Sequence, residues 1–103
     1  MKTDLKASVI IPTYRRPQFL RNALESLARQ STRYTFEVIV VNDAPDEDLS
    51  AVATEFSDIG LNLITPGSNI GRAMARNTGF RDSSGKIIIF LDDDMTVVVT
   101  KIQ

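Results

Sequence analysis

Short apolar runs rich in β-branched residues alternate along this chain with segments of helical periodicity. Residues 8–11, 36–41 and 86–91 form three such runs, and residues 61–65 form a weaker fourth. Continuous apolar runs of this length are typical of strands that are covered on both faces, as in a parallel sheet. The four runs therefore predict four strands of one sheet.

The segments between these runs have apolar residues at helical spacing. Residues 17–28 place leucines and alanines at positions i, i+3, i+4, i+7 and i+8, with a proline in the first turn. Residues 49–56 carry a shorter stripe, and residues 70–81 predict a third helix rich in small residues. Helices between apolar strands imply right-handed crossovers. The predicted fold is α/β, a three-layer Rossmann-like arrangement with a mainly parallel sheet. If the first three strands wind outward in one direction and the fourth returns beside the first, the strand order is 3-2-1-4.

Composition excludes several classes of function. The 103 residues suit one domain, residues 1–103, and contain no cysteine or histidine. Disulfides, thiolate zinc sites and an imidazole base are excluded, so metal or acid–base chemistry must use carboxylates. A net charge of −1 shows no excess of the basic residues that bind the phosphates of nucleic acid. No apolar run reaches the roughly 20 residues of a membrane span. We expect a cytoplasmic protein, at the cytoplasmic face of a membrane in a longer parent.

Polar residues follow each predicted strand. In a parallel sheet the carboxyl ends of all strands share one edge, so these side chains meet in one crevice. A fourth strand that returns beside the first would put the segment 12–14 next to an acidic run, 92–94. The polar residues at this edge are Thr13, Tyr14, Arg16, Asp43, Asn69, Gly71, Asp92, Asp93 and Asp94.

The acidic run 92–94 has two interpretations. Three adjacent carboxylates disfavour one another's ionised forms, and a hard divalent cation such as Mg²⁺ or Mn²⁺ would relieve that repulsion. Alternatively the run is a solvated acidic turn. Its position after a strand that we expect to be buried favours the cation.

Other polar residues also leave two interpretations open. Asp43 either forms a turn and caps the following helix, or accepts hydrogen bonds from a nucleotide. Arg72 and Arg76, one helical turn apart, either form a solvated helix face or pair with a diphosphate. Tyr14 either stacks on a base or closes the end of the core.

Four segments together resemble the family 2 glycosyltransferases, which have the GT-A fold. Residues 7–16 are similar to the opening strand and P-T-Y-N-R turn of that family, and residues 36–43 to its E-V-I-V-V-D-D segment. Residues 69–79 resemble N-x-G-x-x-x-A-R-N-x-G, and residues 90–94 match F-L-D-x-D. One departure is Asn42, where the family has the first aspartate of its pair.

The resemblance implies a nucleotide-diphospho-sugar donor, most often a UDP-sugar, and a Mn²⁺ or Mg²⁺ ion. Asp43 would bind the base, Asp92 the ribose, and Arg76 would lie near the phosphates. Asp94, together with Asp92, would hold the metal. The implied nucleotide-sugar site comprises Pro12, Thr13, Tyr14, Arg16, Asp43, Gly71, Arg76, Asp92 and Asp93.

In the family, the general base that activates the acceptor lies well beyond the D-x-D motif. We therefore interpret this chain as a truncated GT-A domain, the donor-binding half of an inverting glycosyltransferase that does not transfer sugar by itself, with an unknown acceptor. One alternative is a receiver-like signalling domain, which acetyl phosphate would reveal. Another is a scaffold whose exposed strand 86–91 forms homo-oligomers by edge pairing, which sedimentation would reveal.

Overall fold

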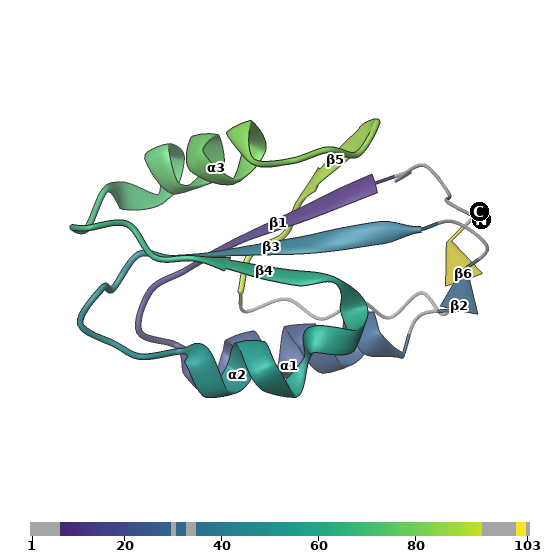
Figure 1. Ribbon diagram of the computed structural model, residues 1–103, viewed down its shortest axis with the longest axis horizontal. Helices are drawn as coiled ribbons and strands as arrows, with labels where there is room; N and C mark the ends of the chain where they lie inside the picture. Colours follow the sequence, from purple (N-terminus) through teal and green to yellow (C-terminus); the bar gives the residue numbers. More distant parts are fainter. Residues whose placement is uncertain (1–6, 30, 33–34, 94–100, 103) are drawn as a thin grey trace.

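The computed structural model describes residues 7–29, 31–32, 35–93 and 101–102 (Figure 1). Four parallel strands form its central sheet: β1 (Ala7–Thr13), β3 (Phe36–Asn42), β4 (Leu61–Ile64) and β5 (Ile87–Phe90). Their order is β4-β3-β1-β5. These strands are the four predicted apolar runs, and the order confirms the predicted 3-2-1-4 arrangement.

Helices cover both faces of this sheet (Figure 1). Helix α1 (Pro17–Ala28) and the short helix α2 (Ser50–Glu55) lie on one face, and α3 (Gly71–Arg81) lies on the other. A 3₁₀ turn, η1 (Ser57–Ile59), leads from α2 into β4. The predicted three-layer α/β/α architecture is therefore confirmed. None of the helices in the described ranges has the length and apolar character that crossing a bilayer requires.

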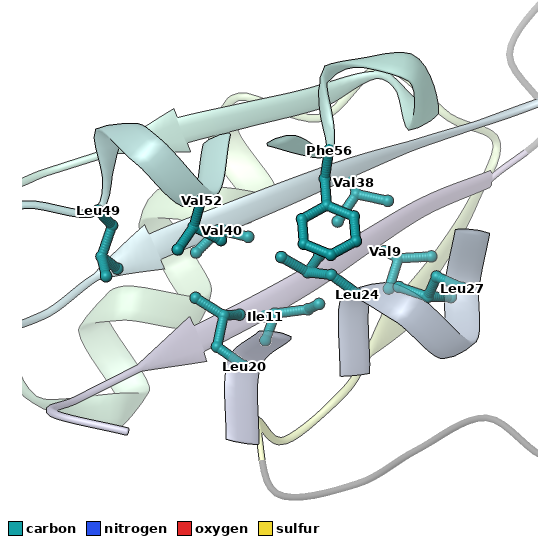
Figure 2. Close-up of a cluster of buried hydrophobic side chains, with 10 residues drawn as sticks. All are labelled: Val9, Ile11, Leu20, Leu24, Leu27, Val38, Val40, Leu49, Val52 and Phe56. Carbon is teal, nitrogen blue, oxygen red and sulfur yellow. The ribbon is translucent and has the colours of Figure 1, made fainter. Parts of the chain in front are cut away.

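The larger core lies between the sheet and the helices α1 and α2. Alternate residues of β1 and β3 face this layer, as the twofold side-chain period of a strand requires. The leucines of the predicted amphipathic stripe in α1 fill the space between them. Figure 2 shows the cluster, which comprises Val9, Ile11, Leu20, Leu24, Leu27, Val38, Val40, Leu49, Val52 and Phe56.

The opposite face of the sheet is covered by α3, which uses small residues where it meets β1 and β3. Ala75 and Gly79 are the buried residues of this helix, and Ala75 packs with Ile10, Ile39 and Val41. A side chain larger than hydrogen at position 79 would collide with the sheet. Of the small residues of 70–81, Ala75 and Gly79 therefore serve close helix–sheet packing, whereas Gly71 lies at the carboxyl edge.

Two short strands were not predicted. β2 (Ser31–Thr32) pairs in parallel with β6 (Lys101–Ile102), away from the main sheet. A strand of two residues is too short to carry a periodic pattern, so its sequence gives no signal.

The expectation that residues 86–91 are buried is wrong. β5 is the edge strand of the main sheet, and three of its four residues are exposed. Neither α1 nor α3 extends over it, because both helices pack on the central strands β1 and β3. The run 92–94 therefore follows a half-exposed strand.

Gly79 gives a direct test of the α3 contact. A Cβ built there lies 2.5 Å from Cγ2 of Ile10 and 3.3 Å from Cγ2 of Val41. We expect Gly79→Ala to lower the free energy of unfolding by about 1–3 kcal/mol, despite the higher helix propensity of alanine. Urea unfolding measures the change. Gly67→Ala, where nothing lies within 4 Å of the new Cβ, is the control. Equal stability of the two variants would contradict this packing.

Asp48 contributes to stability in a pH-dependent way. Its Oδ1 accepts the backbone N–H of Ser50 at 2.9 Å, and this bond, followed by a side-chain bond to the same residue, lowers the pKa of the carboxyl. The ionised Asp48 carboxyl therefore adds to the free energy of unfolding at pH values above the pKa of an aspartate in the unfolded chain, about 3.9. This stabilisation is lost as the pH falls through the lower pKa of Asp48 in the folded protein. We expect Asp48→Ala to destabilise the protein near pH ~6 and to have a smaller effect near pH ~2.5. A pH-independent difference in urea unfolding would contradict this.

Candidate functional site

The segments that follow β1, β3, β4 and β5 meet at the carboxyl edge of the sheet and enclose a cavity of about 430 Å³. The edge is where β1 and β5 lie side by side although they are far apart in sequence, so it is a topological switch point. The cavity is lined by Pro12, Thr13, Tyr14, Arg16, Asp43, Asn69, Gly71, Arg72 and Asp93.

Seven of the nine residues predicted for the nucleotide-sugar site line this cavity; the other two, Arg76 and Asp92, lie beside it. Asn69 and Arg72 also line it. The sequence placed Asn69 at this edge and left the role of Arg72 open, but neither was among the nine residues. Their position in the sequence could have indicated that they line the cavity, because both lie within two residues of Gly71, where a helix begins at the carboxyl edge. Asp94 lies outside the described residues.

Asp43 joins the end of β3 to the start of α3. Its Oδ1 accepts the N–H of Ile70 at 2.7 Å, and its Oδ2 accepts the N–H of Gly71 at 2.9 Å. A carboxylate at a helix N-terminus satisfies orphan N–H groups and meets the positive end of the helix dipole. Asp43 therefore does cap a helix, as one of the two interpretations predicted. That helix is α3, whereas the interpretation expected α2, the helix that directly follows Asp43 in the chain.

Asn42 fixes the loop that follows β3. The side chain is buried, with its Oδ1 accepting the N–H of Ala44 at 3.0 Å and its Nδ2 donating to the carbonyl of Glu47 at 2.8 Å. An amide supplies both a donor and an acceptor, whereas an ionised carboxylate supplies acceptors alone. The departure from the family pattern at Asn42 therefore has a local structural reason.

Asp93 is one of two buried carboxylates that line the cavity, with 3% of its surface exposed against 5% for Asp43. The hydroxyl of Thr13 donates to its Oδ2 at 2.8 Å, and Nη1 of Arg16 lies 3.5 Å from its Oδ1. A buried carboxylate needs such partners, because desolvation otherwise disfavours its charge. These contacts tie the end of β5 to the end of β1.

Arg76 and Asp92 form a second pair beside the cavity. Nη2 of Arg76 lies 3.4 Å from Oδ1 of Asp92, and the two side chains are 39% and 38% exposed. Of the two arginines left open by the sequence, Arg72 faces the cavity and Arg76 faces the end of β5.

Tyr14 and Arg15 form the outer rim. The ring of Tyr14 is 49% exposed, so this side chain does not close the core. Arg15 has a positive φ of 56°, stacks 5.2 Å from the Tyr14 ring centroid and pairs with Asp46 at 2.9 Å. Hydrogen bonding to Tyr14, and then to Asp46, raises the pKa of Arg15 above its ordinary value. The rim therefore carries a guanidinium paired with Asp46 and presents an aromatic face.

Within the described part of the chain, no three acidic side chains lie close enough together to hold a metal ion. Asp43 is engaged by α3, Asp92 by Arg76, and Asp93 by Thr13 and Arg16. A divalent cation that bridges a diphosphate needs one or two carboxylates, and its other ligands are phosphate and water oxygens. The half-exposed Asp92 fits such a role, and Asp93 faces the cavity.

The family model described as glycosyl transferase family 2 matches residues 8–103. The chain belongs to glycosyl transferase family 2. An uncharacterized glycosyltransferase of Rickettsia bellii is 43% identical over 91 residues, covering 88% of this chain and 13% of that protein. The chain spans between 13% and 33% of the length of the first three relatives that it matches. Family membership argues against the receiver-like alternative.

Solved structures of other glycosyltransferases have the same fold as this family 2 chain. S. aureus TarS in complex with UDP-GlcNAc superposes with a TM-score of 0.77 at 32% identity, covering 87% of this chain and 27% of TarS. The mannosyltransferase PcManGT from Pyrobaculum calidifontis, in complex with GDP-Man and Mn²⁺, superposes with a TM-score of 0.81 at 28% identity. The match covers 95% of this chain and 30% of PcManGT. The GT-A fold is thereby established.

Asn42 yields a pH-dependent prediction for this family 2 domain. We expect Asn42→Asp to lower the free energy of unfolding by about 1–3 kcal/mol at neutral pH, because an ionised oxygen would face the carbonyl of Glu47. At lower pH the protonated acid can donate to that carbonyl, so the cost shrinks as pH falls. Urea unfolding across pH measures this, and Asn77→Asp on an exposed position of α3 is the control. A cost that does not change with pH would contradict the assignment.

Proposed function

We propose that residues 1–103 bind a nucleotide-diphospho-sugar as the donor-binding portion of an inverting glycosyltransferase. The observation that carries the proposal is the cavity at the switch point between β1 and β5, which brings cationic and carboxylate side chains together. Its volume lies in the range usual for small-ligand sites. The resemblance of this family 2 chain to proteins solved with UDP-GlcNAc and GDP-Man supports a nucleotide sugar as the ligand.

We assign recognition of the diphosphate to arginine side chains. Helix N-termini commonly bind phosphate through free N–H groups. Here the carboxylate of Asp43 already takes the N–H groups of Ile70 and Gly71. Arg16 and Arg72, which both line the cavity, are therefore the cations that would meet the phosphate charge, with Arg76 beside them.

The base and ribose would lie against the segment that follows β1. Tyr14 offers a half-exposed ring for stacking, and Pro12 and Thr13 line the adjoining wall. Each oxygen of Asp43 has a second lone pair, which can accept an N–H from a base such as uracil. The ribose hydroxyls would be bound by Asp92 and by Asp93, with the latter held in place by Thr13 and Arg16.

For the metal we propose Asp94 together with Asp92 as protein ligands of Mn²⁺ or Mg²⁺. When bound, the ion would offset the charge of the leaving diphosphate. The Asp92 side chain is 38% exposed, and among the described residues it pairs with Arg76 alone, at 3.4 Å, so one of its oxygens can turn toward a ligand. The complex of PcManGT with Mn²⁺ supports a divalent cation in this fold.

Sugar transfer needs a further group. Inversion requires a general base on the face of the anomeric carbon opposite the leaving diphosphate. The described carboxylates of the cavity, Asp43 and Asp93, are held by α3, Thr13 and Arg16 on the nucleotide side. We therefore propose that this chain binds the donor but does not glycosylate an acceptor by itself.

Calorimetric titration with UDP in the presence of Mn²⁺ tests the donor site. We expect millimolar or tighter binding that weakens at least about tenfold, or ~1.4 kcal/mol, in Asp93→Asn and in Arg72→Gln. UMP should bind more weakly than UDP, because it lacks the second phosphate. Asp58→Asn, an exposed carboxylate of η1, is the matched control.

Two outcomes would sink the proposal. One is the absence of heat and of amide shift changes at ~10 mM UDP with Mn²⁺. The other is binding that Asp93→Asn and Arg72→Gln leave unchanged while circular dichroism shows both variants folded. Repeating the titration without Mn²⁺ separates the nucleotide site from the metal.

A further inference from the structure

The loops that follow β1 and β3 are connected at two points. The N–H of Asp43 donates to the carbonyl of Thr13 at 2.8 Å, where the two strands end. Further out, Nη2 of Arg15 donates to both carboxylate oxygens of Asp46, at 2.9 and 3.2 Å. Tyr14, which lines the cavity, lies between these two points along the first loop. The segment that carries this ring is therefore fastened on both sides.

The turn that carries Asp46 is held by several hydrogen bonds. The N–H of Glu47 donates to the carbonyl of Ala44 at 2.8 Å, which closes a four-residue turn with Asp46 at its third position. The buried amide of Asn42 bonds to both ends of the same turn, to the N–H of Ala44 and to the carbonyl of Glu47. A side chain that pairs with Asp46 is therefore tied to the end of β3.

The backbone of Arg15 is in an unfavourable conformation. Among the described residues other than glycine, it alone has a positive φ, 56°. In this left-handed region the Cβ crowds the following carbonyl. The ion pair with Asp46 joins side chains that are 51% and 68% exposed, so it contributes little to folding stability and gives little reason for this conformation. Since backbone strain of this kind clusters at binding sites, the conformation points to a role in the neighbouring cavity.

This conformation brings the guanidinium of Arg15 over the ring of Tyr14, 5.2 Å from the ring centroid. The distance allows a cation–π contact, which is electrostatically favourable. One face of the half-exposed ring is then covered, and the other face is left for a ligand. We propose that Arg15, anchored by Asp46, is a positioning residue that orients the Tyr14 ring for stacking on the base of the nucleotide. This role rests on the donor-binding function proposed above.

Preorganisation is the physical reason why such a contact raises affinity. A half-exposed tyrosine that rotates freely loses that freedom when a base stacks on it, and the loss weakens binding. A ring that Arg15 already holds loses less. Arg15 itself is not among the residues that line the cavity, so its effect on the ligand passes through Tyr14. Diphosphate recognition, assigned to Arg16 and Arg72, should not depend on it.

Titration of single variants with UDP and Mg²⁺, followed by amide chemical shifts, tests this role. Arg15→Asn removes the guanidinium but keeps a residue that tolerates a positive φ, the one that the P-T-Y-N-R pattern has at this place. We expect Arg15→Asn and Asp46→Asn each to weaken UDP binding by about three- to tenfold, because the ring is then free to rotate. The affinity for inorganic pyrophosphate, which has no base, should not change. Asp46→Glu, which still accepts from the guanidinium, should recover part of the loss.

A double-mutant cycle separates this role from a general structural one. In a Tyr14→Leu background, Arg15→Asn and Asp46→Asn should cost little further affinity, because the group that they act on is gone. Circular dichroism checks that all variants are folded, as we expect for substitutions at exposed side chains. Arg29→Asn and Asp58→Asn, at exposed positions away from the carboxyl edge, are the matched controls.

Three results would overturn the positioning role. One is UDP binding by the folded variants that is as tight as that of the unmodified chain. The second is an equal loss of affinity for pyrophosphate, and the third is a full effect of both substitutions in the Tyr14→Leu background. If Asp93→Asn and Arg72→Gln still weaken UDP binding, the donor site stands and only this role fails. A chain that does not bind UDP would overturn both.

Discussion

The carboxylate of Asp43 connects the loops that enclose the cavity. Its two oxygens accept the first N–H groups of α3, while the Asp43 N–H donates to the carbonyl of Thr13 at 2.8 Å. The side chain of Asn69 donates to the Asp43 carbonyl at 2.9 Å. A single residue thus ties the ends of β1 and β3 to the start of α3. The cavity keeps its shape because these loops share one hydrogen-bonded centre.

Sequence periodicity predicted the strands and the main helices, because both depend on where apolar side chains must be buried. The order of the sheet came instead from the assumption that the fourth strand returns beside the first, which the family resemblance supported. Periodicity also placed the polar residues at one edge, since parallel strands end together. What it missed depends on individual hydrogen bonds. The partner of Asp43 is 27 residues further along the chain, and no spacing rule links it to Ile70.

Ser8 is a second residue, within a strand, whose hydrogen bonds the periodicity of the sequence did not predict. It lies fully buried in the apolar run of β1, where its hydroxyl donates to Glu37 at 2.6 Å and accepts the N–H of Gly85 at 2.8 Å. The burial of β5 was mispredicted for a different reason. An apolar run indicates that a strand should be covered, but it does not identify what covers it, and in β5 the described helices do not.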